Sequence, residues 1–216
     1  MSSLASSSPR FDVESFAEAL SDDDDVNRLA RLSNFMFPDE FVKLELVAGS
    51  LNARRMPAFA AALHSRSWSR ITEINLEFNL IQESGAEVLA SALEFNRRIT
   101  SVNLGHCSIR DQGAAAIASA LIQNQDITFL GMSGNEIGDS GALALSEAIA
   151  DNISITTLDL ESNEIGLGWF SRGKYDLASI LATCQVCQTL CIFAHFNLGL
   201  RASRSRRASL AGFMAS

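Results

Sequence analysis

Three cysteines and one histidine near the end of the sequence are the residue types best suited to binding a metal ion. They are Cys184, Cys187, Cys191 and His195. Zn²⁺ prefers thiolate and imidazole ligands, but it needs four of them converging at about 2.0–2.3 Å. A run of four aspartates, residues 22–25, lacks the spaced ligand loop of a calcium site. Whether the cysteines and the histidine converge depends on the elements that carry them.

A serine in the last sixteen residues lies in a sequence that favours phosphorylation. In R-S-R-R-A-S-L-A-G, Arg206 and Arg207 lie three and two positions before Ser209, and Leu210 follows it. This arrangement resembles the substrates of cyclic-AMP-dependent and related basophilic kinases, in which an arginine pair supplies charge to an acidic kinase groove. We predict Ser209 as a phosphorylation site, with a merely solubilising tail as the alternative.

Motifs for catalysis are missing from the sequence. It holds no G-x-x-x-x-G-K-[ST], no H-E-x-x-H and no G-x-S-x-G. The three histidines, His64, His106 and His195, have no partners at catalytic spacing. We therefore predict a protein that is not an enzyme and takes no cofactor.

Charge is distributed unevenly along the 216 residues. Residues 1–200 hold all 25 acidic side chains and 13 of the 17 Lys and Arg, a balance of 13 − 25 = −12. Residues 201–216 carry four arginines and no acid, a charge of +4. An acidic body argues against nucleic acid as a partner.

The cellular compartment is predicted from the lack of a membrane-spanning segment and of a signal peptide in the sequence. No apolar run approaches the roughly 18 residues of a membrane span, and the first residues lack the apolar block of a signal peptide. Four cysteines in this arrangement do not form a secreted disulfide framework, which indicates reduced thiols. We expect the cytoplasm, with the nucleus as the second compartment, and no membrane partner.

The chain repeats itself with a period of 28 residues. Ile-Thr recurs at 71, 99, 127 and 155, and I-T-E-I-N-L-E-F-N-L-I, I-T-S-V-N-L-G-H-C-S-I, I-T-F-L-G-M-S-G-N-E-I and I-T-T-L-D-L-E-S-N-E-I align without a gap. All follow I-x-x-L-x-L-x-x-N/C-x-I, with other apolar residues at some positions. One polar slot is common to the four units and holds Asn79, Cys107, Asn135 and Asn163.

These units resemble leucine-rich repeats of the ribonuclease-inhibitor-like class, supported by G-A-E-V-L-A-S-A-L, G-A-A-A-I-A-S-A-L and G-A-L-A-L-S-E-A-I after three of them. The resemblance implies an α/β fold, a solenoid or horseshoe with parallel strands on the concave face and helices on the convex face. Similar repeats serve sensing in nucleotide-binding leucine-rich-repeat receptors and stimulate GTP hydrolysis as part of Ran GTPase-activating proteins. Protein–protein interaction is therefore expected, with a GTPase regulator or a stand-alone relative of an immune-receptor sensing domain as alternatives.

Physical chemistry predicts the same architecture. Residues two apart share one face of a strand, so Ile74 and Leu76 point inward and Glu73 points outward. Later in each unit, apolar residues four apart, such as Leu89 and Leu93, form one face of a helix. Strands pack about 4.8 Å apart and helices about 8–10 Å apart, so stacked units must bend with the strands inside. The polar slot follows the strand, where a buried amide can bond the backbone of the turn.

The repeats divide the chain into predicted segments. Residues 1–10 are expected to be disordered, 11–40 to form a helical cap, 41–200 to form the repeat domain and 201–216 to be a basic disordered tail. The units are placed near 41–70, 71–98, 99–126, 127–154 and 155–186, with a partial one at 187–200. In this frame the four candidate zinc ligands fall at positions that point in different directions, so we predict no metal site.

Binding is predicted on the concave strand face. Its outward positions hold five acids and one base, which favours a partner with a basic surface. The predicted partner-binding residues there are Glu45, Glu73, Asn75, Glu77, Asn103, Phe129, Asp159 and Glu161. The alternatives are that each acid is merely solvated and that neighbouring side chains cover Phe129.

A longer loop in the fifth unit is the second predicted contact. The concave face of six short strands has an area on the order of 300 Å², whereas each partner in a standard interface buries about 800 Å². Further residues outside the strands must therefore contribute to binding. The stretch G-L-G-W-F-S-R-G-K-Y-D brings four suitable residues together, Trp169, Phe170, Arg172 and Tyr175. The alternative is that Trp169 and Phe170 fold back to cover the end of the core.

Overall fold

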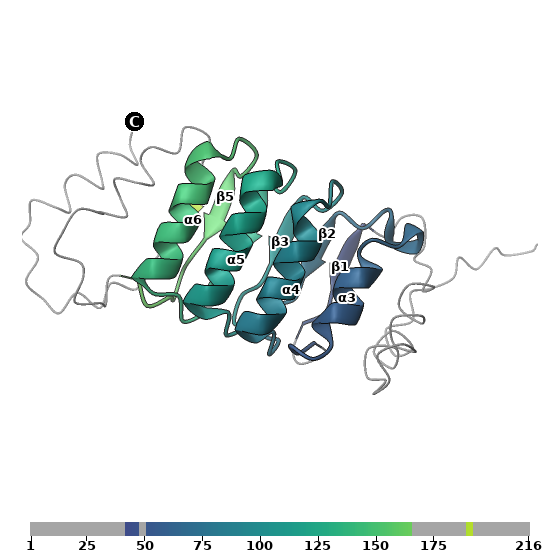
Figure 1. The fold of residues 1–216 in the computed structure, drawn as a ribbon, viewed down its shortest axis with the longest axis horizontal. Helices are drawn as coiled ribbons and strands as arrows, with labels where there is room; N and C mark the ends of the chain where they lie inside the picture. The colour runs from purple at the N-terminus through teal and green to yellow at the C-terminus, as the bar shows by residue number, and fades with distance from the viewer. Residues whose placement is uncertain (1–41, 48–50, 166–188, 192–216) are drawn as a thin grey trace, which may run out of the picture.

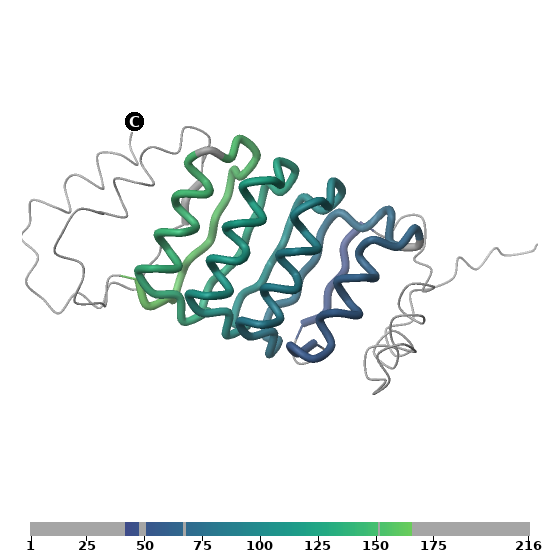
Figure 2. Tube along the Cα trace, in the orientation of Figure 1, coloured from purple at the N-terminus to yellow at the C-terminus, as the bar shows by residue number. Residues whose placement is uncertain are grey.

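The computed structural model describes residues 42–47, 51–165 and 189–191. Within them the chain runs through a strand, a turn, a helix and a return loop, and then repeats this path one step further along the stack, as the tube in Figure 2 shows. None of the helices described is long and apolar enough to cross a membrane.

Six short strands in the described residues form one parallel sheet (Figure 1). They are β1 (Lys43–Glu45), β2 (Glu73–Asn75), β3 (Ser101–Asn103), β4 (Phe129–Gly131), β5 (Thr157–Asp159) and β6 (Thr189–Cys191). The strands lie in sequence order, and the register pairs equivalent residues of successive repeats, for example Ile74 with Val102 and Val102 with Leu130. The predicted parallel sheet is confirmed.

Helices cover one face of this sheet, so the molecule has a strand layer and a helix layer (Figure 1). The helices are α3 (Met56–Ala62), α4 (Gln82–Glu94), α5 (Arg110–Gln123) and α6 (Asp139–Asp151), with a 3₁₀ turn η1 (Arg66–Trp68). Neighbouring helices pack side by side, α4 on α5 and α5 on α6. Parallel strands inside and helices outside are the predicted leucine-rich-repeat fold class, an α/β horseshoe.

Small residues let the helices approach one another. A Cβ atom added at Gly113 of α5 would lie 2.9 Å from the Cβ of Ala86 in α4, which real side chains do not tolerate. Ala86, Ala114 and Ala142 are themselves fully or almost fully buried at equivalent positions. These alanines therefore contribute to the close packing of neighbouring helices.

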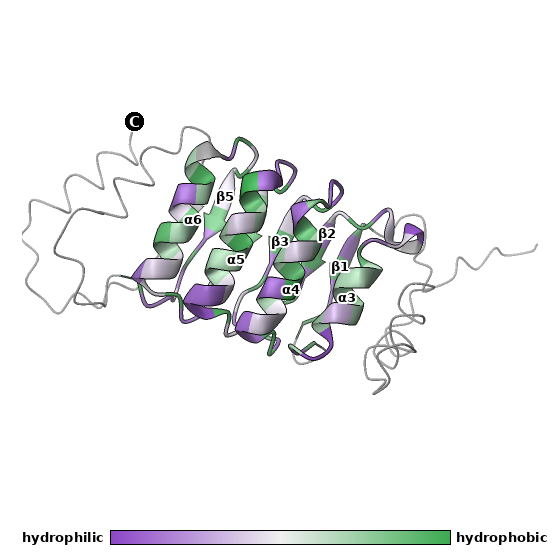
Figure 3. Cartoon of the chain, viewed as in Figure 1, coloured by the Kyte–Doolittle hydropathy of each residue, from purple (hydrophilic) through white to green (hydrophobic). Residues whose placement is uncertain are grey.

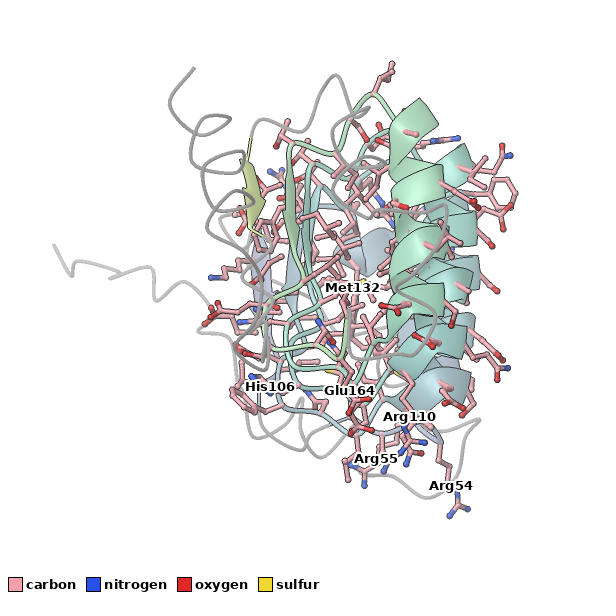
Figure 4. All side chains as sticks on the ribbon, turned by 90° about the vertical axis from the view of Figure 1, so that its left-hand side faces the viewer. Arg54, Arg55, His106, Arg110, Met132 and Glu164 are labelled. Carbon is pink, nitrogen blue, oxygen red and sulfur yellow. The ribbon has the colours of Figure 1, made fainter. Side chains whose placement is uncertain are left out.

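The core lies between the two layers. It takes the inward residues of each strand, such as Ile74 and Leu130, and the inner face of each helix, such as Leu89 and Ile117. Met132, just after β4, lies in this interior between sheet and helices (Figure 4). The outer surfaces of the helices alternate between hydrophobic and hydrophilic residues, and the lower ends of α4 and α5 are hydrophilic (Figure 3).

The polar slot after each strand forms a buried ladder that runs between repeats. We call the four residues in this slot, Asn79, Cys107, Asn135 and Asn163, the turn ladder. The Asn135 amide group donates to the Leu104 carbonyl at 2.7 Å in the preceding repeat, and its Oδ1 accepts the Cys107 N–H at 2.9 Å. Asn79 and Asn163 make the corresponding bonds. The predicted structural role of the asparagines is confirmed, because without them buried backbone groups would lack partners.

Cys107 is the one position in the turn ladder without an amide. Its thiol is buried, and it donates to the Leu76 carbonyl at 3.1 Å, the position that an asparagine amide takes elsewhere. Burial raises the pKa of this thiol to about 11, although the Asn79 N–H beside it has the opposite effect. The thiol is therefore neutral and fills the slot with fewer hydrogen bonds.

A second set of asparagines at the helix exits was missed by sequence reasoning. This exit ladder consists of Asn96, Asn124 and Asn152, all buried and 28 residues apart. The Asn124 amide donates to the Asn96 carbonyl at 2.8 Å, and its Oδ1 accepts the Ile127 N–H at 3.1 Å. Asn152 repeats both bonds one unit later. The signal was present in the sequence as the same period of 28.

Several predictions fall outside the described residues. They concern the cap at 11–40, the loop with Trp169, Phe170, Arg172 and Tyr175, the possible ligands Cys184, Cys187 and His195, and Ser209 in the segment 201–216. These stay predictions.

Candidate functional site

The outward side chains of the strand layer form three rows across the concave face. The first row holds Lys43, Glu73, Ser101, Phe129 and Thr157, and the second holds Glu45, Asn75, Asn103, Gly131 and Asp159. The residues just beyond the strands continue the pattern as a third row, Val47, Glu77, Gly105, Ser133 and Glu161. All eight residues predicted on this face therefore lie on one continuous surface. Their position follows from strand alternation, and their proximity follows from the register.

A shallow hollow of about 250 Å³ lies in this face. Its lining is Lys43, Glu73, Ile74, Asn75, Ser101, Asn103 and Phe129, from β1 to β4. The structure thus brings four of the predicted binding residues, one of them aromatic, around one depression. Glu77, Asp159 and Glu161 lie outside its lining, and Glu45 lies beside Lys43 at its rim.

Phe129 lies at the wall of the hollow, half-buried. An added Cβ at Gly131 would lie 3.3 Å from the Phe129 ring and 2.7 Å from Asn103 Oδ1, so both side chains lie over this glycine. The sequence left open whether Phe129 is exposed or covered. The structure shows an intermediate case, in which the ring is supported from one side and its remaining surface faces the concave side.

The polar side chains of the second row are fixed by their own backbone. Asn75 Oδ1 accepts the Glu77 N–H at 3.2 Å, Asn103 Oδ1 accepts the Gly105 N–H at 3.1 Å, and Asp159 Oδ1 accepts the Glu161 N–H at 2.9 Å. These local bonds hold the side chains in one orientation. Among the described residues, the amide N–H groups of Asn75 and Asn103 have no hydrogen-bond acceptor, so they can donate to a ligand.

Charge on the face is compensated by an ion pair at one place within the described residues. The one basic residue at the outward positions, Lys43, pairs with Glu45 at 2.7 Å. The hydrogen bond to Glu45 and the charge of its carboxylate raise the pKa of Lys43. Both side chains are exposed, so the pair adds little stability. Glu73, Glu77, Asp159 and Glu161 form no ion pair with any described residue. Four negative charges are thus left around and beside the hollow.

The lower edge of the strand layer carries an aromatic stack that sequence reasoning missed. The rings of Phe78 and His106 are parallel, with centroids 4.6 Å apart, and both side chains are exposed. Both residues have positive φ, as does Gly134 at the next equivalent position, where a Cβ would lie 2.3 Å from the His106 ring. Figure 4 shows His106 at this edge on the strand side. The period of 28 joined these positions, but it gave no sign that the rings would stack.

Charged groups at the same edge belong to the helix starts. Arg110 pairs with Glu136 at 3.0 Å and lies 3.8 Å from Glu83, and the Glu136 hydrogen bond raises the pKa of Arg110. Asp111 accepts the N–H groups of Gly138 at 2.7 Å and Gly141 at 3.0 Å. The first turn of α6 is therefore capped by a carboxylate from the preceding helix α5, which links two repeats.

Comparison with known proteins agrees with this geometry. A family model described as Leucine Rich repeat matches residues 95–118, 123–146 and 151–167. The chain contains leucine-rich repeats. No curated protein matches it.

Two solved structures are similar in fold to this chain. One is described as "Leiomodin-1 Actin-Binding Site 2 (ABS2)"; it has a TM-score of 0.54 and 20% identity, and the match covers 87% of this chain and 94% of that one. The other is the tropomodulin C-terminal domain of Caenorhabditis elegans, with a TM-score of 0.53, 16% identity, and coverage of 92% and 99%. At these identities the likeness is one of fold.

Metal-binding groups are not found in the part of the leucine-rich-repeat chain that the structure describes, where no three His, Cys, Asp or Glu side chains gather. Of the candidate zinc ligands, only Cys191 lies in a described strand, where it occupies the register position of Asp159 on the neighbouring strand.

Proposed function

We propose that this protein is a non-catalytic protein-binding module that holds a basic, extended segment of a partner across its concave face. The observation that carries the proposal is the hollow beside Phe129, lined by Glu73, on a face that also carries Glu77, Asp159 and Glu161. These four carboxylates form no ion pair within the described residues. Opposite charge on a partner would guide its approach and fix its register.

Each kind of group in the hollow suits one part of such a segment. The Asn75 and Asn103 amide groups can donate to backbone carbonyls of the segment, because their own oxygens are already bonded. The exposed side of Phe129 offers a surface on which an arginine guanidinium or an apolar side chain can lie. The Glu73 carboxylate lies in the same lining and can pair with a Lys or Arg.

Size makes an extended segment a better fit than a broad protein surface. A floor on the order of 300 Å² is well below the roughly 800 Å² that each partner buries in a standard interface. The predicted contact through the loop with Trp169, Phe170, Arg172 and Tyr175 would enlarge the area and belongs to this proposal.

The 28-residue period also leads us to place the repeats in the ribonuclease-inhibitor-like class.

The test uses two variants of the full chain, in each of which three glutamates are replaced by uncharged glutamine. In the concave variant, Glu73→Gln, Glu77→Gln and Glu161→Gln remove three carboxylates from the strand face. Its matched control removes three carboxylates from the helices, with Glu87→Gln, Glu94→Gln and Glu147→Gln. Binding of a labelled peptide of alternating arginine and serine is measured by fluorescence anisotropy.

The expected result is at least a tenfold weaker affinity for the concave variant and little change for the control. Binding that is equal in both variants would show that the peptide follows net charge alone and would contradict the proposal. Affinity purification with mass spectrometry, comparing the same two variants, would then select cellular partners that depend on the concave face.

Actin is one candidate partner, because the leiomodin-1 structure that shares this fold is named for an actin-binding site. Co-sedimentation with actin filaments, again comparing the concave variant with its control, tests it. The two alternatives from the sequence, a regulator of a GTPase and a relative of an immune-receptor sensing domain, predict other partners. A GTPase stimulation assay separates the first of these from simple binding.

A further inference from the structure

We infer that the concave face has a ligand within its own chain, the basic segment 201–216, and that phosphorylation of Ser209 releases it. This inference rests on the proposed function, since the segment would occupy the face that binds a basic partner. It gives a role to the kinase-substrate sequence around Ser209, which the binding function alone does not use.

Charge is the first argument. The basic segment carries four arginines and no acid, Arg201, Arg204, Arg206 and Arg207, whereas residues 1–200 have a balance of −12. On the concave face Lys43 is already paired with Glu45, and four carboxylates form no ion pair with a described residue. The four positive charges of this segment thus complement the four negative ones of the face in number and sign.

Reach is the second argument. β6 ends at Cys191 and is the strand next to β5, which carries Asp159. Arg204 follows Cys191 by 13 residues, and a chain of that length spans at most about 45 Å. Four strand spacings of about 4.8 Å, or about 19 Å, separate β6 from β2, which carries Glu73. The connection is therefore long enough for the distance that it must span.

A connection within one chain makes weak contacts sufficient. A tethered ligand acts at an effective concentration on the order of 1 mM when the linker length suits the span. Exposed ion pairs are individually weak and screened by salt, so the contact would open and close readily. Such a contact can be displaced by a better ligand or by a change of charge, which is what a regulated site requires.

Phosphorylation would supply that change of charge. The Ser209 hydroxyl oxygen attacks the γ-phosphorus of a nucleoside triphosphate held by the kinase; the new O–P bond forms as the bond to the β–γ bridging oxygen breaks. The nucleoside diphosphate leaves, and the hydroxyl proton passes to the base of the kinase. The phosphate adds about −1.5 to −2 charges, so the +4 of the basic segment falls to roughly half and one end of it is repelled by the carboxylates.

Zero-length cross-linking of the full chain tests the contact. Arg201→Lys and Arg204→Lys keep the charge, leave the Arg206–Arg207 pair intact and introduce two amines. A carbodiimide then joins each lysine amine to any carboxylate it touches, with loss of water, and mass spectrometry identifies the pairs. Mixing ¹⁵N-labelled and unlabelled chains separates links within one chain from links between two.

The expected result is at least fivefold more links from these lysines to Glu73, Glu77, Asp159 and Glu161 than to the helix carboxylates Glu87, Glu94 and Glu147, and within one chain. Equal yields on the two faces, or links that form between chains, would overturn the inference. As a second measurement, replacing the four arginines by glutamine should raise the affinity of the full chain for the free basic peptide several-fold. An unchanged affinity would also count against it.

Phosphorylation is tested on the same protein. Treatment with a basophilic kinase and ATP should place one phosphate on Ser209 and lower the yield of concave-face links at least threefold, while Ser209→Ala keeps its yield. Failure to modify Ser209, or an unchanged yield after modification, would overturn the release step. If peptide binding depends on the concave carboxylates but the cross-links show no preference for them over the helix carboxylates, the intramolecular contact is refuted and the proposed function stands. If peptide binding does not depend on the concave carboxylates and the cross-links show no preference for them, the proposed function is refuted as well.

Discussion

The turn ladder and most of the concave face are built from the same four repeats, but they use repetition differently. Asn79, Asn135 and Asn163 recur in the ladder, and the one exception, Cys107, still donates to the same carbonyl position. Along the first row of the face the equivalent positions change from a glutamate to a serine, a phenylalanine and a threonine.

The difference reflects what each position must satisfy. A ladder residue is buried and must bond backbone groups of its own repeat and of the preceding one, so almost any other side chain leaves unpaired polar groups. A residue on the face meets only its neighbours and a ligand. Repetition therefore marks the part of the molecule that holds it together, and variation marks the part that is free to recognise something.

Breaking the ladder should give the largest effect on stability. Asn135→Ala removes an acceptor of the Cys107 and Ile109 N–H groups and a donor to the Leu104 carbonyl. Because these backbone groups are buried, we expect a loss of about 3 kcal/mol in the free energy of unfolding, measured by urea denaturation. The control is Asn103→Ala on the concave face, which should cost less than about 1 kcal/mol. Equal losses would mean that the two regions do not differ as described.

Alkaline pH should weaken the ladder at its cysteine. The pKa of Cys107 is raised by burial from about 9 to about 11, so between these values the unfolded chain releases the thiol proton while the folded chain keeps it. Stability then falls as pH rises through this window, by on the order of 2 kcal/mol in total. The measurement is the difference in unfolding free energy between wild type and Cys107→Ser from pH 8 to 11. Parallel curves would show that the thiol does not contribute.

Removing the link between helices should have a smaller effect. Asp111→Ala leaves the Gly138 and Gly141 N–H groups at the start of α6 without their carboxylate acceptor. Water can replace part of this contact at the partly exposed edge, so we expect a loss of about 1 kcal/mol by urea denaturation. Asp111→Asn, which keeps one acceptor oxygen, should lose less. A loss as large as that of Asn135→Ala would place this edge with the buried ladder.

Changes on the face should have the smallest effect on folding. The concave variant, with glutamine at 73, 77 and 161, removes like charges that form no ion pair with described residues. Its unfolding free energy should stay within about 0.5 kcal/mol of wild type, while binding of the basic peptide falls at least tenfold. A stability loss above about 1 kcal/mol would show that these carboxylates help to hold the fold together.

Much of the fold could be predicted because each requirement leaves a period in the sequence. Alternation predicted the inward Ile74 and Leu130, four-residue spacing predicted the buried helix faces, and the polar slot predicted the structural asparagines. The exit ladder carried the same period at 96, 124 and 152, but asparagine at a helix end is also an ordinary capping residue. Only its bonds to the preceding repeat show what it does.

The candidate site was predicted as a list of outward positions rather than as a shape. The Lys43–Glu45 pair reduces the charge at one rim, and the hollow forms where Phe129 and Asn103 lie over Gly131. None of this follows from alternation, because it depends on which side chains of neighbouring repeats share a given space.

The sequence by itself determined which residues are equivalent, since a period of 28 with a fixed apolar and polar pattern permits one register of stacked strands and helices. The tertiary structure decided which non-equivalent residues meet: Asp111 with the start of α6, Phe78 with His106, and Phe129 with Gly131. The physical reason is that the register is set by the backbone, which all repeats share. Contacts between side chains depend on the size and charge of residues that differ from one repeat to the next.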